Sequence, residues 1–82
     1  MENSRIALIS IIVENTESTA EMNAVLHEFA PYIIGRMGIP YRERALSLVS
    51  VAMDAPMEKI NAMTGKLGRL SGIKAKAVVS KN

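Results

Sequence analysis

RIALISIIV, residues 5 to 13, contains the longest apolar run of this 82-residue chain. Its β-branched and aliphatic residues run without interruption to the polar segment ENTES, a pattern that predicts a β-strand. Side chains alternate between the two faces of a strand, and both faces are apolar or small here, with Ile9 on one and Leu8 on the other. A strand without a polar face is expected at the centre of its sheet.

Three further segments are predicted to be strands. ALSLVSVAM, residues 45 to 53, is apolar or small on both faces and is therefore expected to be central as well. Residues 32 to 41 contain two glycines and Pro40, which are typical of a short, bent edge strand. Pro cannot donate to a ladder, and Gly indicates either a bulge or a close approach of the backbone. Residues 73 to 79, IKAKAVV, alternate strictly and place two Lys on one face, as edge strands often do to prevent unwanted pairing.

Two helical patterns separate these strands. Ser18 and Glu21 fit a capping box, and apolar residues then recur at helical spacing until Pro31, which predicts a helix over residues 18 to 30. The second pattern begins after Pro56 and continues to Ser71 and Gly72.

Two glycines lie inside the second helical pattern. Gly65 and Gly68 each cost about 1 kcal/mol relative to Ala in a helix interior. We therefore expect something to approach the helix closely there.

The order strand, helix, strand, strand, helix, strand predicts an α+β fold of the ferredoxin-like type. In this βαββαβ sandwich, a four-stranded antiparallel sheet carries two helices on one face, because right-handed crossovers place both helices on the same side. The chain is short enough to form a single domain over residues 1 to 82, and a domain of this size buries only about 60% of its unfolded surface.

The sheet face opposite the helices, called the open face below, is predicted to be apolar. Alternate residues of a central strand should be polar if that face met water, yet both sets consist of apolar residues and Ser. Covering about 600 Å² of it would stabilise by roughly 15 kcal/mol, before association costs of similar size are subtracted. We expect a homo-oligomer, a dimer or tetramer joined through sheet faces or edges; a monomer with an unusually apolar surface is the alternative.

Composition narrows the class of protein further. With no Cys and one His, disulfides are impossible and a closed metal site within one chain is not expected, so we predict no cofactor. The longest apolar run has eight residues, 6 to 13, too few for a membrane span, and the N-terminus lacks the cationic start of a signal peptide. A cytoplasmic protein without membrane contact is expected.

Charge is distributed unevenly, although the net charge is only +2. Residues 1 to 28 hold five Glu against one Arg, whereas residues 59 to 82 hold six Lys or Arg and no acid. Opposite charge in the two ends of a chain can attract an acidic partner or a second copy of the same chain.

Four residues are candidates for ligand binding: His27, Tyr32, Arg36 and Arg42. Guanidinium forks match carboxylate or phosphate groups, and nearby glycines leave backbone amides accessible, so Arg36 and Arg42 would contact an anion while His27 and Tyr32 supply shape and hydrogen bonds. Alternatively, the Arg residues lie on the surface and pair with acids. His27 could hold a metal only across a symmetry axis, and a solvated or helix-capping role is the simpler interpretation.

Other activities find little support in the residues. The segment TGKLGR, residues 64 to 69, lacks the spacing of a phosphate loop, and catalysis is not expected without Cys, a second His or a pair of acids in an apolar context. RNA-recognition modules stack bases on aromatic residues of the central strands, and neither central strand contains one. Direct nucleic-acid binding is therefore not expected.

Three segments, RIALISIIVEN, LHEFAPYIIGRMGIPYRERALSLVSV and INAMTGKLGRLSGIKAKAVVSK, resemble the iron-only hydrogenase system regulator family. The resemblance extends from Arg5 to Lys81, and IIGRMGIPY, residues 33 to 41, is its most distinctive part. It implies a ferredoxin-like fold close to ACT domains and to the C-terminal domain of nickel-responsive repressors. The His and Cys ligands of those repressors are missing here, and ENTES lacks the Gly of the ACT ligand loop.

Together these observations predict a non-enzymatic regulatory module. It would act as an oligomer and bind a small anionic ligand or a partner protein at a groove between subunits lined by residues 32 to 44. The alternative is an assembly or adaptor protein without a small-molecule ligand, whose apolar face only joins subunits or another protein.

Overall fold

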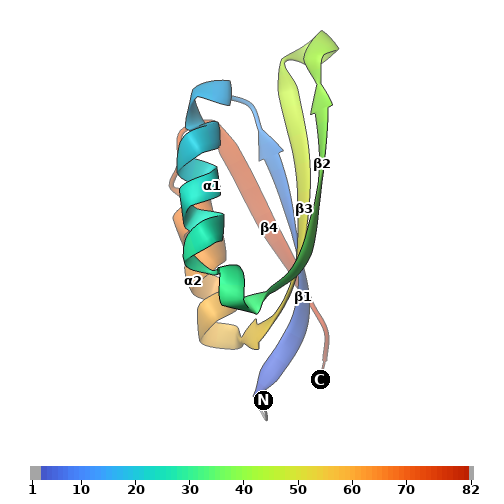
Figure 1. Cartoon of the computed structure of the whole chain (residues 1–82), viewed down its shortest axis with the longest axis vertical. Coiled ribbons are helices and arrows are strands. Elements are labelled where there is room, and N and C mark those ends of the chain that lie inside the picture. The colour runs from blue at the N-terminus through green and yellow to red at the C-terminus, as the bar shows by residue number, and fades with distance from the viewer. Residues whose placement is uncertain (1–2, 82) are drawn as a thin grey trace.

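A computed structural model describes residues 3–81, which form a four-stranded antiparallel sheet with two helices on one face (Figure 1). In chain order the elements are β1 (Ser4–Val13), α1 (Thr19–Glu28), β2 (Ile33–Tyr41), β3 (Leu46–Pro56), α2 (Met57–Gly68) and β4 (Ile73–Val79), with 3-10 turns at Thr16–Ser18, Ala30–Tyr32 and Arg42–Arg44. The predicted α+β, ferredoxin-like βαββαβ fold is confirmed.

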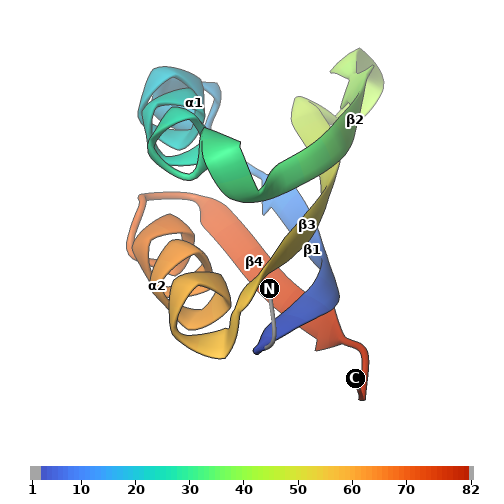
Figure 2. The same cartoon turned by 60° about the horizontal axis from the view of Figure 1, so that its bottom comes forward.

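The strand order β2-β3-β1-β4 places β1 and β3 at the centre and the other two strands at the edges, as predicted. β1 pairs with β3 over its whole length, from Ser4 opposite Pro56 to Val13 opposite Ser47. The edge strand β2 has a register shift between Ile33 and Gly35, so the expected bulge is present. Figure 2 shows both helices on one side of the sheet, with the other side bare.

The core lies between the sheet and the helix layer. Alternate residues of β1 and β3 point into it, and Ile9 and Val51 pair across the two strands with no exposed surface. Burying a side chain of this size stabilises a fold by about 1.5–3 kcal/mol. The helices contribute the buried side chains of Met22, Leu26, Ile60, Met63 and Leu67, and Phe29 and Ile73 add two more from outside the helices.

The predicted capping box at the start of α1 is wrong. A 3-10 turn precedes the helix, and Ser18 adopts a helical backbone with no side-chain capping bond. Ser18 is 2% exposed, and its hydroxyl instead donates a 2.6 Å hydrogen bond to the carbonyl oxygen of Ser71. This bond joins the β1–α1 connection to the α2–β4 connection. The side chain of Asn15 caps the preceding turn, because its Oδ1 accepts from the amide of Glu17 at 3.0 Å.

Within residues 3–81, nothing approaches the glycines of α2 closely. A Cβ added to Gly68 would meet nothing within 4 Å, and one added to Gly65 would meet only the flexible end of Arg69, at 3.9 Å. The close approach occurs at Gly72 instead, in the turn before β4. Its φ of 68° is left-handed, and a Cβ there would lie 2.5 Å from the Cβ of Asn15.

Element ends differ modestly from the predicted ones. α1 ends at Glu28 because the segment with Pro31 forms a 3-10 turn, and α2 ends at Gly68, before the predicted Ser71. β3 continues past residue 53 to Pro56, so that Asp54 belongs to the sheet. The β2–β3 hairpin extends beyond the N-terminal end of α1 (Figure 1), and the molecule measures 42 × 18 × 17 Å.

Candidate functional site

The open face of the sheet carries a broad apolar surface, as the sequence predicted. Seven large apolar side chains on it are 40–67% exposed, and they come from all four strands: Ile6, Leu8, Ile12, Met37, Ile39, Leu48 and Val78. Charged groups lie only at its margins among the described residues, with two Lys on β4 and Asp54 near one end of β3.

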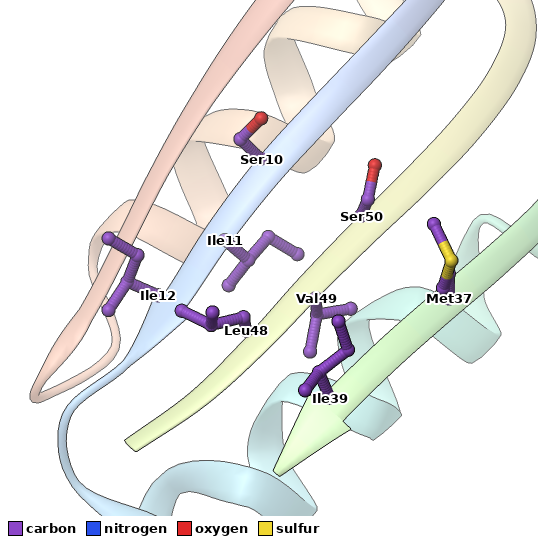
Figure 3. Close-up of a pocket in the computed structure, with 8 residues that line it drawn as sticks. All are labelled: Ser10, Ile11, Ile12, Met37, Ile39, Leu48, Val49 and Ser50. Carbon is purple, nitrogen blue, oxygen red and sulfur yellow. The ribbon is translucent and has the colours of Figure 1, made fainter. Parts of the chain in front are cut away.

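Cross-strand pairing arranges this surface in rows. One row runs from Ile39 through Leu48 and Ile12 to Lys74. The next row places Ser50 and Ser10 side by side between Met37 and Lys76. Figure 3 shows these rows without their Lys residues, and the hydroxyls of Ser10 and Ser50 point the same way from neighbouring strands. The side chains drawn there line a shallow hollow of about 250 Å³. The surface can therefore bury aliphatic groups, and it offers the hydroxyls of Ser10 and Ser50 near its centre.

A second surface lies on the helix side of the sheet, between α1 and the edge strand β2; we call it the α1–β2 groove. Residues of β2 that point toward the helices pair with buried residues of β3, as Arg36 does with Val51 and Gly38 with Val49. They nevertheless stay exposed, because the helix layer does not extend over this edge. A hollow of about 240 Å³ results, with Val13, Met22 and Val49 at its base and Thr19, Asn23, Arg36 and Ser47 at its rim.

Arg36 connects the two walls of the groove. Its Nη1 donates a 3.2 Å hydrogen bond to Oδ1 of Asn23 on α1. The same side chain also lines an adjoining hollow of about 290 Å³, together with His27. Arg36 therefore stands between two hollows, where its remaining N–H groups can reach an anion.

Two of the four predicted ligand residues lie close together in the folded chain, and the other two lie apart from them and from each other. His27 and Arg36 line the same hollow beside α1. Tyr32 is half-buried and lines a separate small depression with Asp54, before β2 begins. Arg42 lies in the 3-10 turn after β2. The nine residues of β2 separate Tyr32 from Arg42, which amounts to roughly 30 Å of extended chain.

Three polar residues of the groove were missed by sequence reasoning, namely Thr19, Asn23 and Ser47. Asn23 gave a usable signal, because it precedes His27 by four residues and so shares its face of α1. Thr19 gave the same signal, because it precedes Asn23 by four residues, whereas Ser47 gave none, because only the angle between α1 and the sheet brings it to the groove. His27 itself is exposed, and its neighbour Glu28 is engaged with Lys66 across a 2.6 Å ion pair.

Within residues 3–81, no three His, Asp or Glu side chains gather closely enough to hold a metal ion. No helix in this part of the chain has the length and apolar character needed to cross a membrane.

Two distant structural neighbours share the fold. A formyltetrahydrofolate deformylase from Pseudomonas putida KT2440 superposes with a TM-score of 0.68 at 10% identity, covering 94% of this chain but 29% of the deformylase. CPII, a nitrogen regulatory PII-like protein from Thiomonas intermedia K12, gives a TM-score of 0.53 at 12% identity over 93% of this chain and 94% of its own. Identities this low show a common fold and nothing more. No curated protein matches the sequence.

A nearer relative is TM1266 of Thermotoga maritima, which is described as an uncharacterized protein and has a solved structure. It is 30% identical, has a TM-score of 0.91, and the alignment covers 95% of this chain and 99% of TM1266. The TM1266-like family, described as "Iron-only hydrogenase system regulator, putative", matches residues 5–77. Nearly the whole sheet and both helices fall within that match, and the chain therefore belongs to the TM1266-like family.

Proposed function

We propose that this protein is a non-enzymatic regulatory module of the iron-only hydrogenase system that assembles through its open face and binds a small anionic ligand. The family description supports a regulatory role. The observation that carries the proposal is the open face, where seven large apolar side chains remain 40–67% exposed. Contiguous apolar surface of this kind is unusual on a monomer and typical of an interaction site.

A second copy of the chain is the occupant we propose for the open face. The apolar rows are wide enough to pair with themselves, and an isologous contact uses the same patch on both subunits. The acidic first 28 residues and the basic residues 59 to 82 also favour association of two copies.

Ligand binding is centred on Arg36 and His27 in this proposal. Arg36 has no carboxylate of residues 3–81 within 4.0 Å of its guanidinium, since its partner is the neutral amide of Asn23. A neighbouring subunit would be needed to bring Tyr32 or Arg42 to the same ligand. CPII was solved bound to ADP, AMP and bicarbonate, so a protein with this fold can hold small ligands.

The assembly is tested by light scattering coupled to size exclusion. Wild type should have a mass that is a multiple of the 8.9 kDa chain. Leu8→Lys places a charge within the apolar rows and should give the monomer mass, because an unpaired Lys is costly to bury. Ala24→Lys makes the same change on the exposed side of α1 and should leave the mass of the assembly unchanged.

A monomeric wild type at micromolar concentration would contradict the proposal. An assembly that Leu8→Lys leaves intact would place the subunit contact elsewhere on the molecule, and the proposed role of the open face would be lost.

An adaptor protein without a small ligand is the second candidate, and the separation of Tyr32 and Arg42 from the hollow at Arg36 favours it. The two candidates differ in their response to small molecules. If no anion raises the melting temperature and Arg36→Ala leaves the assembly unchanged, the adaptor role is favoured.

A further inference from the structure

The α1–β2 groove contains an empty position that neither backbone geometry nor packing explains. Gly38 points toward the helix layer, since it pairs with the buried Val49. Its φ is not left-handed; among the described glycines only Gly72 has a positive φ. A Cβ on Gly38 would meet one atom, the carbonyl oxygen of Leu48 at 4.0 Å. A side chain would fit there without strain, so glycine at this position keeps space open above the base of the groove.

The base of the groove is apolar and its rim is polar. Val13, Met22 and Val49 form a base that is at least nine-tenths buried. Thr19 and Ser47 bring hydroxyls to the rim, and Arg36 brings a cation. This combination of an apolar floor and a few convergent polar groups is the usual design of a small-molecule site.

The lining has a positive charge and no negative one. None of the residues that line the groove is acidic, and the hydrogen bond from Arg36 to Asn23 leaves the guanidinium charge unneutralised. The situation of Lys66 is different, because Glu28 neutralises it at 2.6 Å. A ligand that enters the groove is therefore attracted if it carries an anion, and an ammonium group on it would find no carboxylate among the lining residues.

We propose that the α1–β2 groove binds a compact aliphatic carboxylate, such as a branched 2-oxo acid. The carboxylate would pair with Arg36, the branched chain would lie on Val13, Met22 and Val49, and the oxo group would accept from a rim hydroxyl. The inference rests on the proposed regulatory function, because it names the class of ligand, but it uses a surface separate from the open face.

Size and charge separate this class from other small ligands. A hollow of about 240 Å³ is smaller than the ~300–1,000 Å³ typical of drug-sized ligands. Nucleotides would bring a purine to a lining without aromatic residues, and their phosphate charge would meet one guanidinium. An α-amino acid of the same shape would bury its ammonium beside Arg36, and bicarbonate or acetate would leave the apolar base uncovered.

Isothermal titration of the full-length protein with 4-methyl-2-oxopentanoate tests the proposal. Leucine, acetate, bicarbonate and AMP are the comparison ligands. We expect the oxo acid to bind at least tenfold more tightly than each of them. Equal binding of leucine or AMP would overturn the ligand class, and no binding of the oxo acid would overturn the site.

Matched variants locate the site. Arg36→Met removes the charge while keeping the length of the side chain, and should weaken binding about tenfold or more. Its control, Arg44→Met, changes a cation at the hairpin tip and should bind as wild type does. Gly38→Val fills the groove and should abolish binding, whereas Gly35→Val adds the same side chain to the open-face position opposite Ala52 and should not.

The result separates the groove from the assembly. Wild-type affinity in Gly38→Val would show that the ligand binds elsewhere and would overturn the proposal; circular dichroism confirms that each variant is folded. If the wild type does not bind the oxo acid but still assembles, the groove proposal fails and the open face remains the functional surface. Arg36-dependent binding of the oxo acid to a monomeric protein would support the groove and contradict the proposed assembly through the open face.

Discussion

The two faces of the sheet have nearly the same composition and opposite surroundings. Ile9 and Leu8 are neighbours on β1, yet Ile9 has no exposed surface and Leu8 is 50% exposed. The helices cover one face because both crossovers place them there, and no part of residues 3–81 covers the other. The composition of a strand therefore does not reveal which of its faces the chain itself covers, because an apolar face can be covered by the same chain or by another molecule.

The largest expected effect on stability is the difference between truncating Ile9 and truncating its neighbour Leu8. Ile9→Ala should lower the free energy of unfolding by about 2–5 kcal/mol, because it leaves a cavity in the packed core. Leu8→Ala should cost below about 1 kcal/mol in the monomer, since half of the side chain already meets solvent. Urea unfolding monitored by circular dichroism measures both variants.

Protein concentration sharpens this pair of variants. If a second copy covers the open face, the cost of Leu8→Ala should grow with protein concentration while the cost of Ile9→Ala relative to wild type stays constant. Equal costs for the two variants in dilute protein would mean that the open face is not open.

The strand order could be predicted because it depends on composition alone. A strand that is apolar on both faces belongs at the centre, and strands with Pro, Gly or paired Lys belong at the edges. The helix ends could not be predicted in the same way. Ser18 has the residue type and spacing of a cap, but the preceding 3-10 turn directs its hydroxyl to Ser71, a contact that depends on the tertiary fold.

The candidate site was predicted in part for a similar reason. Arg36 and His27 share a hollow, and helical spacing relates His27 to Asn23. The α1–β2 groove itself follows from how far α1 reaches over the edge of the sheet, a quantity that the periodicity of a helix does not contain. Tyr32 and Arg42 are close to Arg36 in sequence, yet an extended strand carries them to opposite ends of β2.

The turn before β4, where Gly72 lies against Asn15, should give the second-largest effect on stability. Gly72→Ala introduces a Cβ 2.5 Å from that of Asn15 at a left-handed φ of 68°. We expect a loss of more than about 1 kcal/mol in the free energy of unfolding. Gly68→Ala is the control, because its Cβ would meet nothing within 4 Å. It should leave stability unchanged or raise it, and a loss as large as that of Gly72→Ala would contradict the account of the turn.

Two serines give the smallest and most selective contrast between the faces. Ser18→Ala removes the 2.6 Å bond to the carbonyl of Ser71 from a position that is 2% exposed, and should cost about 1 kcal/mol. Ser10→Ala removes a hydroxyl from the open face, where water satisfies it in a monomer, so its cost should be near zero. In an assembled protein the same change makes the open face more apolar, and it should preserve or strengthen self-association. Unfolding and light scattering on both variants therefore separate a hydroxyl that the fold requires from one that only the interface would notice; weaker association of Ser10→Ala would instead indicate that the hydroxyls at the centre of the open face bond to the partner.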